Sequence, residues 1–122
     1  MSKDNVIQDK SYQFAIRIVK LYQYLVANKK EFVLAKQLLR SGTSIGANIE
    51  EAIGGQSRRD FIAKLSIAYK EARETHYWIR LLRDTGYLDQ NQATSLLNDL
   101  EEILRITVSI LKTAKNNEGM KE

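Results

Sequence analysis

Basic and aromatic residues are interspersed between positions 59 and 80 of the chain. On a helix they project away from the apolar residues of the same segment. They are Arg59, Tyr69, Lys70, Arg73, Tyr77 and Arg80. Arginine and lysine pair with phosphates, and tyrosine rings stack on unpaired bases, so this composition indicates a nucleic-acid-binding surface. The alternative is an ordinary solvated face, because Glu74 lies four residues after Lys70, a spacing that favours an ion pair on a helix.

A second polar group includes Asn48, which lies at the edge of an apolar stripe. A buried amide without a partner costs about 1–3 kcal/mol. Glu71 flanks the apolar stripe of a later segment, and Glu74 follows one turn further on. We expect Asn48 to form a structural polar network with one of these carboxylates. The alternative is that Asn48 caps a helix end or meets water.

The residue types that enzymes and metal sites most often need are scarce. The chain has no cysteine and one histidine, His76, which excludes disulfides and thiolate ligands. A di-iron centre in a helical bundle needs Glu-x-x-His on two helices, and this motif is absent. Gly42 and Gly46 follow no predicted strand and therefore form no phosphate-binding loop. We expect a protein that is not an enzyme and holds no metal or cofactor.

The net charge of +4 is compatible with nucleic-acid binding but is shared by many other proteins. The first helix and the loop after it also carry basic residues, namely Lys10, Arg17, Lys20, Lys29 and Lys30. The polar N-terminus lacks the apolar core of a signal peptide. No apolar run approaches the roughly 20 residues that span a bilayer. We expect a cytoplasmic protein without membrane association.

The chain contains no proline and only six glycines, so it can be helical almost from end to end. Apolar residues recur every three to four positions in four segments, at about 10–27, 31–53, 57–85 and 89–115. Four amphipathic helices joined by short loops bury their stripes together as an antiparallel up-down four-helix bundle. We expect one all-α domain over residues 1–122, ordered between about residues 10 and 115, with frayed termini.

Local signals predict where these helices begin and end. Asn28–Glu31 has the spacing of a capping box for the second helix. Gly54 and Gly55 are expected to end it in the left-handed conformation. Ser57 is the expected N-cap of the third helix, with Gly86 beyond its end, and Asp89 opens the fourth with Gln92.

Two glycines inside the second helix, Gly42 and Gly46, each cost up to about 1 kcal/mol relative to alanine. They project beside Ile45, next to the apolar stripe. We expect another helix to approach closely there, in the same subunit or in a neighbour. Direct ligand contact is the alternative.

Several motifs carry a family resemblance. They are Arg40–Ala52 (RSGTSIGANIEEA), Ser57–Ile62 (SRRDFI), Leu65–Ala68 (LSIA) and Glu71–Trp78 (EARETHYW). In order and spacing they resemble the bacterial four-helix-bundle proteins encoded in 23S ribosomal RNA intervening sequences, over about residues 10 to 115. The family often has glycine where this chain has Ala52, so the turn after the second helix is expected slightly later here.

The resemblance implies a four-helix bundle that assembles into a ring-like homopentamer. Similar to the family is the accessory protein of diversity-generating retroelements, which associates with a reverse transcriptase and binds nucleic acid through a basic surface. The family supplies no catalytic residues and no basic contacts to carry over. We therefore expect a homo-oligomeric accessory protein that binds RNA or DNA. The alternative is an adaptor that binds another protein through apolar residues outside the core stripes, such as Tyr12, Ile16, Val19 and Val26.

Overall fold

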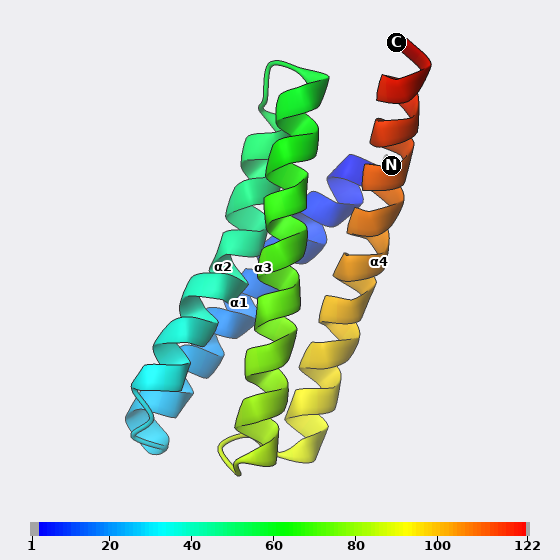
Figure 1. The fold of residues 1–122 in the computed structure, drawn as a ribbon. Helices are drawn as coiled ribbons and strands as arrows, with labels where there is room; N and C mark the ends of the chain where they lie inside the picture. The colour runs from blue at the N-terminus through cyan, green and yellow to red at the C-terminus, as the bar shows by residue number, and fades with distance from the viewer. Residues whose placement is uncertain (1–2, 122) are drawn as a thin grey trace.

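The computed structural model describes the backbone of residues 3–121 and the side chains of residues 6–117. The helices of this part of the chain are α1 (Lys3–Asn28), α2 (Val33–Ile53), α3 (Arg58–Asp84) and α4 (Gln90–Lys121). Each helix packs against its neighbour in sequence, and α4 also packs against α1 (Figure 1). The fold is therefore an up-down four-helix bundle, which confirms the expected all-α class.

The apolar stripes of all four helices meet in one buried core. Burying a large aliphatic or aromatic side chain stabilises the fold by about 1.5–3 kcal/mol, so these residues dominate the packing energy. Leu34 and Phe61 are only partly buried against this core. The largest fully buried side chains are Ile7, Phe14, Ile18, Leu25, Leu38, Ile45, Ile49, Leu65, Ile79, Leu82, Leu100 and Ile103.

The two glycines within α2 mark a close approach between α2 and α1 of the same chain. Gly42 is buried against Ile18, and a Cβ atom at Gly42 would lie 2.8 Å from both γ-carbons of Ile18. Gly46 is buried against Ser11, and a Cβ atom there would lie 3.4 Å from the Ser11 carbonyl oxygen. The predicted close approach is confirmed, and it is tighter at Gly42 than at Gly46.

Two helix ends lie beyond their predicted positions. Helix α1 begins at Lys3 instead of about residue 10, and Ile7 is buried in the core. The polar residues around Ile7 hid this extra turn of the apolar stripe. Helix α4 continues past residue 116 to Lys121. The prediction that the termini are frayed also covers residues 1–2 and 122, which lie outside the described residues.

The capping box predicted at Asn28–Glu31 is wrong. Helix α2 begins at Val33, and its N-cap, Phe32, makes no side-chain cap. Instead, the Oε1 atom of Glu31 accepts a hydrogen bond of 2.9 Å from the backbone N–H of Ala35. Lys30 turns the chain with a φ of 54°, a left-handed conformation in a residue other than glycine.

The turn after α2 falls where it was predicted, but its conformation differs. Gly54 has a φ of −80°, so the left-handed conformation expected there is wrong. A different constraint acts on Gly55, because a Cβ atom there would lie 2.5 Å from Oδ2 of Asp60. The other predicted caps are confirmed. Ser57 Oγ accepts a hydrogen bond from the Asp60 N–H, Gly86 has a φ of 87°, and Asp89 Oδ1 accepts one from the Gln92 N–H.

Candidate nucleic-acid interface

The basic and aromatic residues of α3 lie on its outer side, as the sequence predicted. The inner side of the helix buries a run of small and aliphatic residues from Leu65 to Leu82. Arg59, Lys70, Arg73, Tyr77 and Arg80 are exposed, and Tyr69 is partly buried. We call these six residues the α3 outer face.

Within this face, two arginines each lie against a tyrosine of the same helix. Arg73 lies against Tyr69, and Arg80 lies against Tyr77. The Arg73 guanidinium is 5.9 Å from the ring centroid of Tyr69, and its Nη1 donates a 3.1 Å hydrogen bond to the Tyr69 hydroxyl. The Arg80 guanidinium is likewise 5.9 Å from the ring centroid of Tyr77. Because a guanidinium has five N–H donors, both arginines keep donors that can bind an anion.

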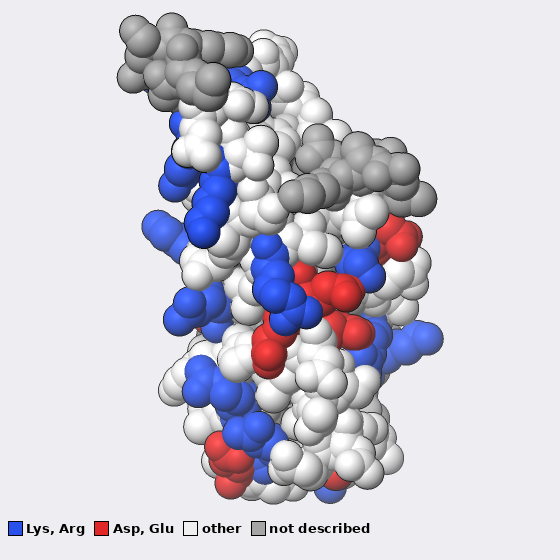
Figure 2. Space-filling view, turned by 90° about the vertical axis from the view of Figure 1, so that its right-hand side faces the viewer, with Lys and Arg blue, Asp and Glu red and all other residues white. Residues whose placement is uncertain are grey.

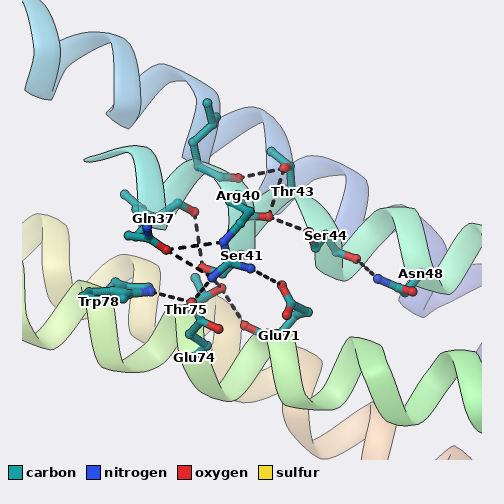
Figure 3. Close-up of polar contacts among 12 residues, drawn as sticks. Gln37, Arg40, Ser41, Thr43, Ser44, Asn48, Glu71, Glu74, Thr75 and Trp78 are labelled. Atoms are coloured by element: carbon teal, nitrogen blue, oxygen red, sulfur yellow. Dashed lines mark hydrogen bonds and ion pairs between the residues drawn. The ribbon is translucent and has the colours of Figure 1, made fainter. Parts of the chain in front are cut away.

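Two acidic residues in the middle of α3, Glu71 and Glu74, turn toward α2 and leave the outer face. Glu71 Oε2 accepts a 3.3 Å bond from Arg40 Nη1, and Glu74 Oε2 accepts one from Arg40 Nη2 (Figure 3). Glu74 Oε2 also accepts a 2.9 Å hydrogen bond from Trp78 Nε1. The Lys70–Glu74 ion pair, which was the alternative for this face, does not form, and Lys70 has no acidic partner among the described residues.

The expected link between Asn48 and a carboxylate is also wrong. Asn48 Nδ2 donates a 2.8 Å hydrogen bond to the carbonyl oxygen of Ser44 in its own helix (Figure 3). A carbonyl one turn back is always within reach of a helical side chain, so this local partner replaces the distant one. The two carboxylates form their network around Arg40 instead.

A buried polar contact between α2 and α3 was not predicted. The Thr75 and Ser41 hydroxyl oxygens lie 2.9 Å apart, and both residues are buried. Thr75 donates its one proton to the Glu71 carbonyl oxygen at 2.7 Å, so the Ser41 hydroxyl supplies the proton between the two oxygens; Ser41 Oγ also lies 3.4 Å from the Leu38 carbonyl oxygen. The only signal in the sequence was a threonine in the apolar stripe of the third helix.

Helix α4 supplies basic residues that were not predicted as part of the site. A groove runs between α3 and α4, and Tyr69 lines both of its adjoining parts. Three aliphatic residues of α4 form its floor: Leu111 is buried, and Leu104 and Val108 are partly buried. The other residues lining this α3–α4 groove are Ser66, Lys70, Arg73, Arg105, Lys112 and Lys115.

The rim of the α3–α4 groove is uniformly basic. Of the described residues that line it, five are lysine or arginine and none is aspartate or glutamate. Lys112 and Lys115 form no ion pair with a described residue, and neither does Arg105. Figure 2 shows this face, with Lys and Arg side chains and no Asp or Glu visible along its upper left; acidic side chains lie near its centre, at its right and at its lower left.

The opposite side of α4 is different, because its charges are paired with those of α1. Lys10 Nζ lies 2.5 Å from Glu102 Oε1, and Arg17 Nη1 lies 2.6 Å from Asp99 Oδ2. We call these two pairs the α1–α4 seam. The hydrogen bond and charge of Glu102 raise the pKa of Lys10, and Lys10 lowers the pKa of Glu102 for the same reason. The seam therefore offsets part of the basic charge predicted for the first helix.

His76 connects α3 to α4 below the groove. Its Nδ1 accepts a 3.0 Å hydrogen bond from Arg80 Nε, and its Nε2 lies 3.4 Å from Glu101 Oε2. Among the described residues, no three histidine, aspartate or glutamate side chains are grouped as metal ligands. No helix in the described part of the chain combines the length and the apolar character that crossing a membrane requires.

Comparisons with known proteins identify relatives over most of the chain. The family model described as 23S rRNA-intervening sequence protein matches residues 3–109. A crystal structure of a protein from Bacteroides thetaiotaomicron is similar, with 58% sequence identity and a TM-score of 0.90. The similarity covers 91% of this chain and 99% of that one, which is described as a protein with unknown function from the S23 ribosomal protein family. No curated protein matches this chain.

Proposed function

The chain belongs to the family of 23S rRNA-intervening sequence proteins, and we propose that it is a non-enzymatic, homo-oligomeric accessory protein that binds nucleic acid. RNA is the proposed target, with little sequence specificity. The accessory protein of diversity-generating retroelements is similar to this family, which supports an accessory role beside a nucleic-acid enzyme.

One observation carries the nucleic-acid part of this proposal. The four cations of the α3 outer face form no ion pair with a carboxylate among the described residues, although Glu71 and Glu74 lie on the same helix. Both carboxylates are engaged by Arg40 of α2. The outer face therefore keeps its positive charge, together with two tyrosine rings, and that combination suits phosphates and unpaired bases.

The binding of labelled mixed-sequence RNA, followed by fluorescence anisotropy, tests this proposal. We expect the double variant R73E/R80E to weaken binding on the order of tenfold or more, because each lost phosphate contact no longer releases counterions. The variant K20E/K36E changes the net charge by the same amount at exposed positions on α1 and α2, and it is the matched control. If the wild type binds neither RNA nor DNA at low salt, the proposal is wrong.

The homo-oligomeric part is supported by exposed apolar side chains on α1. Tyr12 is 61% exposed, Val19 is 38% exposed and Ile16 is 36% exposed. Apolar residues at helical spacing on an outer surface are typical of helices that pack against another chain. Light scattering measures the mass directly. A single-chain mass at all concentrations would contradict this part of the proposal.

The same residues favour a second candidate function, an adaptor that binds a different protein. Val26, named with them from the sequence, is partly buried against the core and adds little to this surface. The variant I16R separates the two roles. Conversion to a monomer would assign the α1 surface to self-assembly. An unchanged mass, with loss of a defined partner whose binding resists nuclease, would assign it to the adaptor role.

A further inference from the structure

The α3–α4 groove differs from the rest of the surface because it combines an apolar floor with a basic rim on both walls. Lys70 and Arg73 rise from α3, and Arg105, Lys112 and Lys115 rise from α4. Like charges that face each other across a groove repel one another, and none of the residues that line this groove is an aspartate or a glutamate. A polyanion with an apolar part would satisfy the rim and the floor together.

Tyr69 occupies the centre of this arrangement. It lines both parts of the groove, and the hydrogen bond from Arg73 Nη1 to its hydroxyl fixes the tilt of its ring. The ring is only partly buried, so part of it remains open to the groove. An aromatic ring in a fixed orientation beside several cations is typical of sites that bind single strands. Unpaired bases stack on the ring, and the cations neutralise the phosphates.

We propose that the α3–α4 groove is the binding site for a single-stranded RNA segment. One or two bases pack on Tyr69, Val108 and Leu111, and the flanking phosphates contact Lys70, Lys112 and Lys115. This inference rests on the proposed nucleic-acid-binding function and names the form of nucleic acid bound and its site. It moves the centre of binding from the ridge of α3 to the groove beside it.

A single strand fits this groove better than a duplex. The bases of a duplex are stacked and paired, so a duplex presents only phosphates and groove edges and cannot use the apolar floor. The wider part of the groove has a volume of about 430 Å³, which suits one or two bases between two adjacent helices. A duplex would contact the rim alone.

An acidic amphipathic helix is the other ligand class to consider. Such a helix binds through apolar anchors repeated over several turns. The floor offers aliphatic side chains over only about two turns of α4, from Leu104 to Leu111, and the cations stand on both walls. The groove is therefore short for a helix and well matched to a flexible phosphate chain.

The test uses a labelled, unstructured RNA of twelve nucleotides and fluorescence anisotropy at moderate salt. We expect K112E/K115E to raise the Kd by tenfold or more and the equally charged control K20E/K36E to raise it by no more than about threefold. Lys112 and Lys115 are exposed, so circular dichroism should show an unchanged fold. The same RNA annealed to its complement should compete less well than the single strand.

Tyr69 variants test the stacking separately from the charge. Y69F keeps the ring and should keep the affinity within about twofold, whereas Y69L should lose on the order of fivefold or more. Because Y69F removes the hydroxyl that Arg73 binds, it also shows whether that bond is needed. Equal losses in Y69F and Y69L would contradict stacking on Tyr69.

The outcomes distinguish this inference from the function on which it rests. If K112E/K115E and K20E/K36E lose the same affinity, the groove is not the binding site, although the protein still binds RNA. If the duplex competes as well as the single strand, the proposed ligand form is wrong. If the wild type binds no nucleic acid, both proposals fall. If an acidic helical peptide binds the wild type, does not bind K112E/K115E, and displaces the RNA from neither protein, the groove belongs to a protein partner.

Discussion

The two sides of α4 differ in whether their charged residues are paired with residues of opposite charge on the neighbouring helix. On the side of α1, Lys10 and Arg17 face Glu102 and Asp99, and each cation is paired. On the side of α3, the cations of α4 face Lys70 and Arg73 across a groove that no described carboxylate lines. The seam supports the fold, whereas the groove opposes it slightly and keeps its charge for a ligand.

This difference shows why net charge alone says little about function. Three of the four acidic residues of helix α4 lie in its first half, and the groove lysines lie in its second half. The total of +4 hides this separation, because the first helix contributes basic residues that the acids of α4 then neutralise. A surface is a candidate for anion binding when its cations have no local partners, and the comparison across α4 identifies that surface.

The largest expected effect is a loss of stability in a variant that disturbs the packing of α1 against α2. This packing positions α1 and therefore the α1–α4 seam. G42A places a Cβ atom 2.8 Å from the γ-carbons of Ile18, which is fully buried and β-branched. We expect it to lower the free energy of unfolding by about 1–3 kcal/mol, measured by urea denaturation. G46A is the matched control.

In G46A the nearest contact is the Ser11 carbonyl oxygen at 3.4 Å, so the gain in helix propensity should make it neutral or up to about 1 kcal/mol stabilising. Because the groove lies between α3 and α4, folded G42A should bind RNA as the wild type does. Equal stability of the two variants would refute the inferred difference between the glycines.

Salt should separate the groove from the seam in the wild type. Raising the salt from 50 to 200 mM should weaken single-stranded RNA binding by roughly twenty- to a hundredfold if about three to five phosphates are neutralised. The thermal midpoint should change little, because screening weakens the seam attraction and the groove repulsion together. An affinity that does not depend on salt would rule out phosphate contacts at the rim.

Single charge reversals on the two sides of α4 should have opposite effects on stability. K112E removes a cation from the groove and places a carboxylate near Lys115, so it should raise the thermal midpoint by about 1–2 °C and weaken RNA binding several-fold. K10E places two carboxylates together in the seam, so it should lower the midpoint and leave RNA binding nearly unchanged. Calorimetry and anisotropy on the same preparations provide both readings. If both variants lowered the thermal midpoint, the proposed difference between the two sides of α4 would be wrong.

The smallest expected effect is the response of the seam to acid. Lys10 holds the pKa of Glu102 below its usual range, mainly through their hydrogen bond. A carboxylate whose pKa is lower in the folded state stabilises the fold above its unfolded pKa, and this contribution disappears as the pH falls through the folded value. Between pH 7 and pH 3, K10M should therefore lose slightly less stability than the wild type. Identical pH profiles would show that the pair contributes nothing.

Much of the fold could be predicted because helical periodicity reports directly on which side of each helix is buried. The stripes from Phe14 to Leu111 and the caps at Ser57, Gly86 and Asp89 all follow from local spacing. Local spacing also produced the errors. It missed Ile7 among polar neighbours, and it gave Asn28 a capping role that Glu31 performs from outside the helix.

The candidate site was predicted only in part, because spacing does not reveal which faces of two helices meet. The α3 outer face was correct in orientation, but the Lys70–Glu74 pair failed because Arg40 of α2 and Trp78 engage Glu74. The fourth helix was interpreted through its apolar repeat alone. Only packing brings Arg105, Lys112 and Lys115 opposite Tyr69, so the groove could not be identified from the sequence.

Photocrosslinking of a 4-thiouridine-labelled single-stranded RNA to the wild-type protein, followed by mass spectrometry of the linked peptides, tests the central claim most directly. If the RNA binds in the α3–α4 groove, we expect crosslinks within residues 66–73 and 104–115, with Tyr69 among the modified residues. Links concentrated on α1 or α2, or spread evenly over the exposed lysines, would contradict it.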